Sequence, residues 1–369
     1  MAGLYIHIPF CRSRCAYCDF YSTTREAEMA MYVEALCQEI AARRQELPNT
    51  RVRTIYIGGG TPSLLPTPLL RRILDCVWQH YEVEAEAEVT MEMNPDDSVD
   101  NAQLREVNRV SLGVQTFNDD LLRLIRRRHD SATAIRAVHA LQEAGINNIS
   151  IDLIYGLPGQ TMALWEHDLN TAFSLGVQHL SAYALSYEQG TALTRWRNEG
   201  RIQEVPEELS VAMYERLCQR AREAGFEHYE ISNFALPGLH SRHNSSYWTG
   251  TPYLGFGPGA HSYDGDRTRR ANLPSLDLYM NRGKQEVEVL TEDECYDEMV
   301  MCGLRTCDGV DLNRMAQRFG AERAQTLLRQ AAPHIAAGRL AHRGNKLCLT
   351  TKSLMISDDI MSDLMAIES

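Results

Sequence analysis

Three cysteines near the start of the chain, Cys11, Cys15 and Cys18, constrain its fold and chemistry more than any other feature. They lie in the run HIPFCRSRCAYCDFYS, with the spacing CxxxCxxC, directly after the apolar strand pattern LYIHIP. Three thiolates can hold three irons of a 4Fe–4S cluster and leave the fourth iron without a protein ligand. An open metal position is a place where a substrate can bind. The motif therefore predicts an iron–sulfur cluster with one free corner.

Two other interpretations of the cysteine motif fit less well. A structural zinc site takes four ligands, and the nearby sequence offers no second CxxC or HxxxH pair. A disulfide framework is typical of small secreted chains, whereas this chain has 369 residues. The other cysteines are scattered, and Cys37 and Cys218 lie in helical patterns where small buried side chains are expected.

Composition limits the classes of function. With 44% hydrophobic residues, the chain can bury the core of one large domain and a smaller one. The net charge of −12 repels phosphate backbones and argues against nucleic-acid binding. No apolar run is long enough to cross a bilayer, and the start, MAGLYIHIPF, lacks the pattern of a secretory signal. We therefore expect a cytoplasmic protein with reduced cysteines.

Strand and helix patterns alternate along the first half of the chain. Strands are predicted at Leu4–Ile8, Arg53–Ile57, Glu88–Met93, Arg109–Val114, Asn148–Ile154 and His179–Leu185. Helices are predicted at Ala27–Glu46, Thr67–His80, Asn101–Val107, Ser131–Ala144 and Thr161–Leu175. This alternation indicates an α/β fold with a parallel sheet and helices outside it. Six such units predict a partial (β/α)6 TIM-like barrel rather than the full eight.

Unusual polar residues fall on the predicted strands or directly after them. The cysteine loop follows the first strand, Gly58–Thr61 end the second, the third carries Glu92 and Asn94, Gln115 follows the fourth, and Asp152 and Tyr183 lie on the fifth and sixth. The carboxyl ends of the strands form the active-site face of such barrels. Glycine alone would indicate ordinary turns, but Glu92, Gln115 and Asp152 are not typical turn residues. We interpret these positions as one functional rim.

The second half of the chain has a different pattern. An amphipathic helix at 206–224 and a short strand at 228–232 precede a loop region, rich in Gly, Pro, Tyr and His, that runs to about residue 266. From residue 290, short helices and a strand pair predict a small helical or winged-helix-like domain. We therefore predict a barrel over 1–235, a connecting region over 236–289 and a C-terminal helical domain over 290–369.

Motifs spread over nearly the whole chain resemble one known family. They are YIHIPFC, CDFYS, YIGGGTPS, MEMNP, SLGVQTFN, IDLIYGLPGQT, YEISNFA and RHNSSYW. Together they are similar to the oxygen-independent coproporphyrinogen III oxidase-like group of the radical SAM superfamily. The resemblance implies a 4Fe–4S cluster on Cys11, Cys15 and Cys18 whose open iron binds S-adenosylmethionine (SAM). It also implies that one electron splits SAM into a 5′-deoxyadenosyl radical, which abstracts hydrogen from a substrate.

The same resemblance implies which residues contact SAM: Tyr5, Tyr17, Gly59, Gly60, Thr61, Glu92, Gln115, Arg127, Asp152, Ala184 and His261. The chemistry suits these roles, because glycines let the backbone approach a ligand and an arginine fork can bind a carboxylate. A phosphate loop is the competitor for the glycines, but no GK[ST] ending follows them. Arg127 matches an LGRxH pattern from which this chain departs by Arg126 in place of glycine; a solvated basic helix face is the alternative for 126–128.

One position separates two branches of this group. The oxidases have a further cysteine two residues after the third, where this chain has Phe20. This replacement and a later HNxxYW element resemble the heme-chaperone branch. The resemblance implies heme contacts at His243, Asn244, Tyr247 and Trp248, with His240 and His261 as rival ligands. Histidine and tyrosine can ligate heme iron and aromatic rings can contact a porphyrin, although the element could equally cap the barrel without binding anything.

We therefore expect a heme chaperone that carries a SAM-binding 4Fe–4S cluster and passes heme to acceptor proteins. The expected partners are heme, heme acceptors that include membrane-bound respiratory proteins, and a protein that reduces the cluster. The alternative is an enzyme, either an oxygen-independent coproporphyrinogen III oxidase or another radical SAM enzyme that modifies tetrapyrroles. The missing cysteine at Phe20 argues against the oxidase. A third alternative is a non-catalytic interaction protein.

Overall fold

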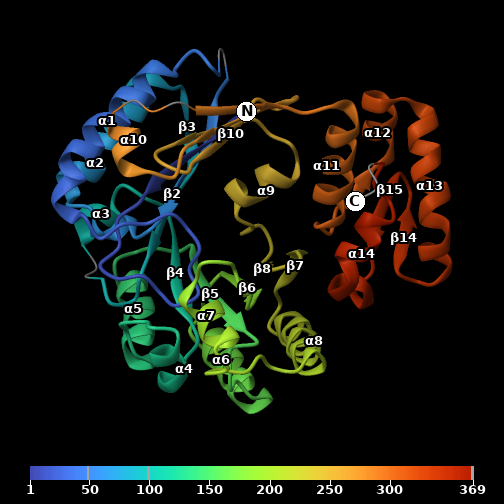
Figure 1. Ribbon diagram of the computed structural model, residues 1–369, viewed down its shortest axis with the longest axis horizontal. Coiled ribbons are helices and arrows are strands. Elements are labelled where there is room, and N and C mark those ends of the chain that lie inside the picture. The colour runs from blue at the N-terminus through green and yellow to red at the C-terminus, as the bar shows by residue number, and fades with distance from the viewer. Residues whose placement is uncertain (48–49, 98–99, 282, 284, 367–369) are drawn as a thin grey trace.

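Six parallel strands form the centre of the fold. The computed structural model describes residues 1–47, 50–97, 100–281, 283 and 285–366 (Figure 1). The central strands pair in the order of the chain: β1 (Ala2–Ile8), β2 (Val52–Gly59), β3 (Val83–Met93), β4 (Arg109–Gln115), β5 (Ile149–Tyr155) and β6 (His179–Ala184). Within the described ranges, β1 and β6 do not pair with each other, so the barrel is open. This confirms the predicted partial barrel.

Helices between the strands cover the outside of the sheet (Figure 1). They are α1 (Met29–Ala42), α2 (Thr67–His80), α3 (Asn101–Leu104), α4 (Asp119–Leu124), α5 (Ser131–Glu143), α6 (Met162–Ser174), α7 (Ala192–Asn198) and α8 (Glu207–Glu223). Side-chain caps fix several starts: Asp130 accepts a hydrogen bond from the Thr133 N–H, and Thr161 from the Leu164 N–H. The short helices α4 and α7 were not predicted, and α3 is shorter than predicted.

The strands sort their side chains between two environments. On β4, Val110, Leu112 and Val114 belong to the buried apolar core under the helices. The alternate residues Arg109 and Ser111 line a cavity inside the barrel. This separation follows from the two-residue period of a strand. It puts polar chemistry inside the barrel and the stabilising apolar core outside it.

The region predicted as a loop up to about residue 266 is instead part of the sheet. β9 (Tyr253–Phe256) pairs in parallel with β1, and β10 (His261–Tyr263), β11 (Thr268–Asn272) and β12 (Gln285–Val289) extend this edge antiparallel. At the other edge, β8 (Asn233–Ala235) and β7 (Glu227–Glu230) follow β6. The loop prediction was wrong because these strands are only three to five residues long. Such lengths give too little alternation for a sequence pattern to reveal them.

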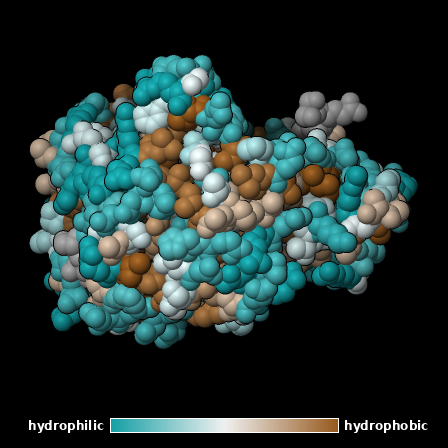
Figure 2. Space-filling model, turned by 90° about the horizontal axis from the view of Figure 1, so that it is seen from below, coloured by the Kyte–Doolittle hydropathy of each residue, from teal (hydrophilic) through white to brown (hydrophobic). Residues whose placement is uncertain are grey.

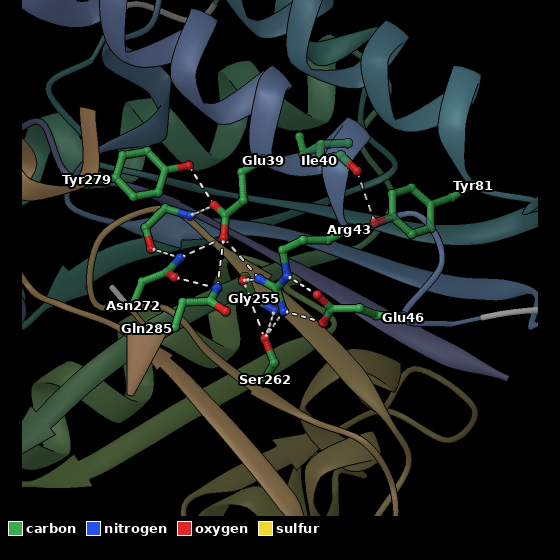
Figure 3. Close-up of polar contacts among 11 residues, drawn as sticks. Glu39, Ile40, Arg43, Glu46, Tyr81, Gly255, Ser262, Asn272, Tyr279 and Gln285 are labelled. Atoms are coloured by element: carbon green, nitrogen blue, oxygen red, sulfur yellow. Dashed lines mark hydrogen bonds and ion pairs between the residues drawn. The ribbon is translucent and has the colours of Figure 1, made fainter. Parts of the chain in front are cut away.

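A buried polar network fastens this added edge to α1 (Figure 3). Arg43 donates to the carbonyl of Gly255 at 2.7 Å and to Ser262 Oγ at 2.9 Å, and pairs with the carboxylates of Glu39 and Glu46 at 3.0 Å. Glu39 in turn accepts hydrogen bonds from the Gly257 N–H, Asn272 Nδ2, Tyr279 and Gln285. The network joins α1 to β9, β10, β11, β12 and α10 (Leu276–Met280).

The C-terminal part has its own apolar core. α11 (Glu292–Leu304), α12 (Leu312–Phe319), α13 (Ala321–Ala336) and α14 (Ser357–Ser362) surround the small sheet β13 (Val310–Asp311), β15 (Lys346–Leu349), β14 (Leu340–Arg343). Figure 2 shows it as the smaller lobe beside the larger barrel lobe. This helical lobe with a strand hairpin matches the predicted fold class, while the three domain ranges stay a prediction. Within the described ranges, no helix is both long and apolar enough to cross a membrane.

Candidate functional site

A cavity of about 510 Å³ lies inside the barrel, with the cysteine loop in its wall. Besides Cys11, Cys15 and Cys18, its lining includes nine of the residues predicted to contact SAM: Tyr17, Gly59, Gly60, Thr61, Glu92, Gln115, Arg127, Asp152 and Ala184. These residues come from seven segments separated in sequence, and parallel strands carry most of them to the same end of the barrel.

The three cysteines fit a polynuclear cluster. All three are partly exposed, and two of their sulfurs accept hydrogen bonds, from Thr61 Oγ1 to Cys11 Sγ at 3.5 Å and from Arg127 Nη1 to Cys15 Sγ at 3.3 Å. Burial raises the pKa of the Cys11 thiol, and the Thr61 hydrogen bond and the Arg127 charge partly oppose this rise in favour of the thiolate, the form that binds metal. In the described part of the chain, no three His, Cys, Asp or Glu side chains are arranged to hold a single metal ion. The donor set therefore suits a 4Fe–4S cluster better than zinc.

Glycine at position 59 lets the end of β2 turn beside the cysteine loop. Gly59 has a φ of 109°, and a Cβ there would lie 2.5 Å from the His7 ring. Its N–H donates to Glu92 Oε2 at 2.9 Å, while the Tyr56 hydroxyl donates to Glu92 Oε1 at 2.8 Å. The turn thus fixes one carboxylate in the cavity wall.

Arg127 is held in the cavity by its neighbours and does not belong to a solvated helix face. Its Nη2 donates to Asn94 Oδ1 at 2.6 Å and to the carbonyl of Gly113 at 2.7 Å. Asn94 Nδ2 donates onward to Thr61 Oγ1 at 3.0 Å. The guanidinium, the asparagine and the threonine therefore form one chain of donors beside the cysteines. Such a fixed fork is suited to binding a carboxylate.

Two non-glycine residues with positive φ lie in the cavity wall. Among the described residues, only Gln115 (φ 70°) and Arg126 (φ 59°) have this backbone conformation without being glycine. The guanidinium of Arg126 lies 4.7 Å from the centre of the Trp196 ring. The left-handed backbone explains why the LGRxH pattern has glycine at this position. Strain of this kind gathers at functional sites.

Burial changes the acidity of two carboxyl groups in the cavity. It raises the pKa of Glu92 from 4.5 to about 7, and hydrogen bonds from Tyr56 and the Gly59 N–H only partly oppose this. It raises the pKa of Asp152 to about 6, partly opposed by Ser181 and Arg109. Both groups are therefore poised to exchange protons near neutral pH. Both can accept hydrogen bonds from ligand hydroxyls.

Comparison with known proteins agrees with this geometry. The model of the radical SAM superfamily matches residues 5–172. A protein of Bacillus subtilis (strain 168), named heme chaperone HemW, is 38% identical over 333 residues, which cover 87% of each chain. This chain belongs to the radical SAM superfamily. A second relative, also named heme chaperone HemW, from Synechocystis sp. (strain ATCC 27184 / PCC 6803 / Kazusa), is 39% identical over 88% of this chain and 82% of its own.

Other matches extend the radical SAM likeness to the C-terminal lobe. The model of the HemN C-terminal domain matches residues 290–356. A Danio rerio protein, named radical S-adenosyl methionine domain-containing protein 1, mitochondrial, is 33% identical over 84% of this chain and 74% of its own. The structure of coproporphyrinogen III oxidase (HemN) from Escherichia coli has a TM-score of 0.84, with 23% identity, over 99% of this chain and 90% of that one. It shares the fold of both lobes.

Two predicted SAM contacts lie outside the lining of the radical SAM cavity. The Tyr5 ring stacks on Tyr56 with centres 6.1 Å apart, and its hydroxyl is 3.0 Å from His7 Nδ1. Tyr5 therefore packs against Tyr56, which itself lines the cavity. His261 is exposed on β10, where it pairs with Ala271 of β11. The structure does not bring His261 to the cavity, and its contact with SAM stays a prediction.

The HNxxYW element is a helix, α9 (Arg242–Trp248), near the amino ends of β1 and β2. Ser241 caps it by accepting from the Asn244 N–H, and Glu88 accepts from the N–H groups of Arg242 and His243, both at 3.0 Å. A carboxylate at a helix N-terminus is stabilising. Asn244 alone of the four predicted heme residues lines the cavity.

His243 has both ring nitrogens occupied. Nδ1 lies 2.8 Å from Thr54 Oγ1 and Nε2 lies 2.8 Å from the Tyr247 hydroxyl, and the side chain is 1% exposed. Burial lowers the pKa of His243 to about 3, so the ring is neutral. Trp248 lies under Arg305, whose guanidinium is 5.0 Å from the ring centre. In this arrangement His243 anchors α9 to the barrel, and iron ligation would require one of its two hydrogen bonds to break.

The sequence placed Asn94 on the functional rim without giving it a ligand contact, and it did not reveal Arg109 as a residue of the cavity. Asn94 connects Arg127 to Thr61, and the MEMNP motif at the end of a predicted strand was the available signal. Arg109 lines the cavity from the start of β4. The signal for Arg109 was weaker: a cation at an alternate, inward position of a strand whose other residues are apolar or small.

Proposed function

We propose that this protein is a heme chaperone, which binds heme and passes it to acceptor proteins, and that its cavity holds SAM beside a 4Fe–4S cluster. One observation carries the proposal: two proteins named heme chaperone HemW are 38% and 39% identical to this chain over 87% and 88% of its length. Phe20, where the oxidases have a cysteine, is 63% exposed and lines the cavity.

In the proposed SAM complex, residues of the cavity have separate tasks. Cys11, Cys15 and Cys18 would hold the cluster, which supplies an electron to SAM. Arg127, aligned by Asn94, would bind the SAM carboxylate with its guanidinium fork. Glu92 and Asp152 would accept hydrogen bonds from hydroxyl groups of SAM. The strained backbone at Gln115 and the turn at Gly59 would hold the wall in this shape before SAM arrives.

The proposed heme ligand is best sought among the three histidines of this region. His243 is buried with both nitrogens bonded. His240 lies 2.8 Å from Glu227 and stacks on Tyr229 with ring centres 4.1 Å apart. His261 is exposed. His261 is therefore the histidine that can reach iron with the least rearrangement, whereas His243 and Tyr247 would have to leave the barrel floor.

A hemin titration tests heme binding and identifies the ligand. Anaerobically reconstituted protein is titrated with hemin, and the Soret band is recorded for wild type, His261→Ala and a His243→Ala/Tyr247→Ala variant. We expect wild type to bind hemin and one of the two variants to lose the ligated spectrum. The exposed His342, in the C-terminal lobe, provides a control as His342→Ala. A wild-type protein without a Soret shift contradicts the proposal.

Heme transfer and coproporphyrinogen III oxidation are measured separately on the same preparation of the protein. Heme-loaded protein is mixed with apomyoglobin as a model acceptor, and reduced protein with SAM is given coproporphyrinogen III. The proposal predicts that holomyoglobin forms at a rate that increases with the concentration of this protein, and that protoporphyrinogen does not accumulate. Protoporphyrinogen formation without heme transfer would instead identify an oxidase.

A further inference from the structure

The interior of this barrel is unusually polar. The inner layers of a (β/α) barrel are normally filled with branched apolar side chains. Here the inward positions of β4, β5 and β6 carry Arg109, Ser111, Asp152, Ser181 and Tyr183, which all line the cavity. Such a set costs stability unless its members are paired.

Most polar groups at the amino end of the barrel are paired. His179 Nδ1 lies 2.7 Å from Ser150 Oγ, and its Nε2 lies 2.7 Å from the Tyr229 hydroxyl. His243 is bonded in the same way by Thr54 and Tyr247. Each imidazole therefore has a partner for both nitrogens. This floor of the barrel is built to satisfy buried polar atoms.

Arg109 is the exception. Its side chain is 1% exposed, and its guanidinium makes no hydrogen bond or ion pair with any residue that the structure describes. Thr90, its register partner on β3, is fully buried, and its hydroxyl also has no partner within the described ranges. Two polar groups without a partner among the described residues, the Arg109 guanidinium and the Thr90 hydroxyl, therefore lie at paired positions of neighbouring strands.

The carboxyl of Asp152 on the neighbouring strand β5 makes no ion pair with this cation. Asp152 is close enough for Arg109 to lower its pKa, yet the described residues contain no Arg109–carboxylate pair within 4.0 Å. Ser111, which is on the same strand as Arg109, donates from Oγ to Asp152 Oδ1 at 3.2 Å, so this carboxyl already has a hydrogen-bond partner. A buried charge is retained against its desolvation cost when it pairs with something. The missing partner is therefore an anion that enters the cavity.

SAM is not that anion in the proposed arrangement. Arg127, which is bonded to Cys15 Sγ and Asn94, is the fork available to the SAM carboxylate. Arg109 is the first residue of β4 and Gln115 the last, so about 20 Å of strand separate the two ends of this wall. The cysteines are at the carboxyl end and Arg109 is at the amino end. The cavity thus has an arginine guanidinium at each end, that of Arg127 at the carboxyl end and that of Arg109 at the amino end.

We propose that Arg109 binds the carboxylate of a second ligand that shares the cavity with SAM. Its planar fork fits a carboxylate with two parallel hydrogen bonds, and Asn244 of α9 lines the same cavity as a further donor. This inference rests on the proposed function for the class of ligand: the carboxylate is a propionate side chain of the tetrapyrrole. Arg109 therefore recognises the unesterified propionate carboxylate and not the heme iron.

Esterified heme separates recognition of the carboxylate from recognition of the ring. Hemin and hemin dimethyl ester are titrated into wild type, Arg109→Gln and Arg109→Lys. We expect Arg109→Gln to weaken hemin binding at least tenfold, with Arg109→Lys between it and wild type, because a charged hydrogen bond is lost. The ester is expected to bind wild type and Arg109→Gln within twofold of each other. Arg105→Gln removes the same charge from an exposed position and serves as the control.

The outcomes distinguish a failure of the inferred Arg109 carboxylate site from a failure of the proposed heme binding. Equal hemin binding by wild type and Arg109→Gln overturns the inference, and so does an equal loss of hemin and ester, which would mean that Arg109 only supports the fold. A wild type that binds neither compound contradicts the proposed function instead. The carboxylate site is then tested with ¹³C-propionate, whose NMR line must broaden with wild type and not with Arg109→Gln; no broadening with wild type overturns the inference too.

Discussion

At the scale of single residues, a left-handed backbone at two non-glycine residues, Gln115 and Arg126, helps to shape the cavity wall. Arg126 has a left-handed backbone at the end of α4, where its N–H bonds the carbonyl of Arg123. Its guanidinium compensates by packing on Trp196. The neighbouring Arg127 is thereby aimed into the cavity. The arginine that replaces glycine of the family pattern at position 126 therefore strains the backbone, and its contact with Trp196 offsets that strain.

Replacing Arg126 tests this balance. Arg126→Gly removes a backbone penalty of about 1 kcal/mol and loses a cation–π contact of about 0.5–1 kcal/mol. We therefore expect the free energy of unfolding to change by less than about 1 kcal/mol. Arg126→Val, which is β-branched, should lower it by more than about 1 kcal/mol, because it combines strain with loss of the contact. Urea denaturation measures both, and a glycine variant no more stable than the valine variant contradicts the account.

Glu92 links stability to pH. Its pKa is about 7 in the folded chain and 4.5 as the ordinary value, so the folded state binds more protons between these limits. The stabilising contribution of the Glu92 carboxyl to the free energy of unfolding is then fully present below about pH 4.5 and is lost as the pH rises to about 7. Glu92→Gln should reduce the wild-type loss of unfolding free energy between pH 5 and pH 8 by about 1–3 kcal/mol. The exposed Glu86→Gln on the same strand is the control, and identical pH profiles for Glu92→Gln and wild type would refute the shift.

At the scale of elements, α1 connects the barrel to its added edge. Glu39 accepts hydrogen bonds from two strands, from α10 and from the segment at Gly257, all of which lie more than 200 residues away in the chain (Figure 3). The charged network replaces the apolar contacts that short edge strands cannot supply. We conclude that β9 to β12 depend on this polar anchor.

Removing the charge of Glu39 should loosen that edge. Glu39→Gln leaves Arg43 buried without its full counter-charge, and we expect the free energy of unfolding to fall by about 2–4 kcal/mol. Glu34→Gln, on the exposed face of the same helix, weakens a surface pair with Arg72 and a surface hydrogen bond from Gln38, and should cost less than about 1 kcal/mol. Hydrogen exchange of the β11 amides should increase for Glu39→Gln alone. Equal effects of the two substitutions would show that the network does not anchor the edge.

At the scale of the whole molecule, the sequence predicted those strands and helices that have long hydrophobic residue patterns of their own. β1 to β6 were predictable because runs such as LYIHIP are apolar and end in unusual polar residues. The edge β9 to β12 was not, because the pairing of β9 with β1 and of each further strand with its neighbour, rather than local alternation, makes these residues strands. The heme contact of His243 stays a prediction, and the motif could not show that Thr54 and Tyr247 occupy both of its ring nitrogens. Arg109 escaped notice because an unpaired cation is visible only after its surroundings are known.

Iron analysis with EPR spectroscopy tests the central claim, that three cysteines hold a cluster beside a SAM site. Wild type is compared with Cys11→Ala/Cys15→Ala/Cys18→Ala and with the control Cys37→Ala/Cys76→Ala/Cys218→Ala. We predict about four iron and four sulfide per chain in wild type and control after anaerobic reconstitution, close to none in the motif variant, and an EPR signal of reduced wild type that changes when SAM is added. Wild type without iron, or a motif variant that keeps it, would contradict the account.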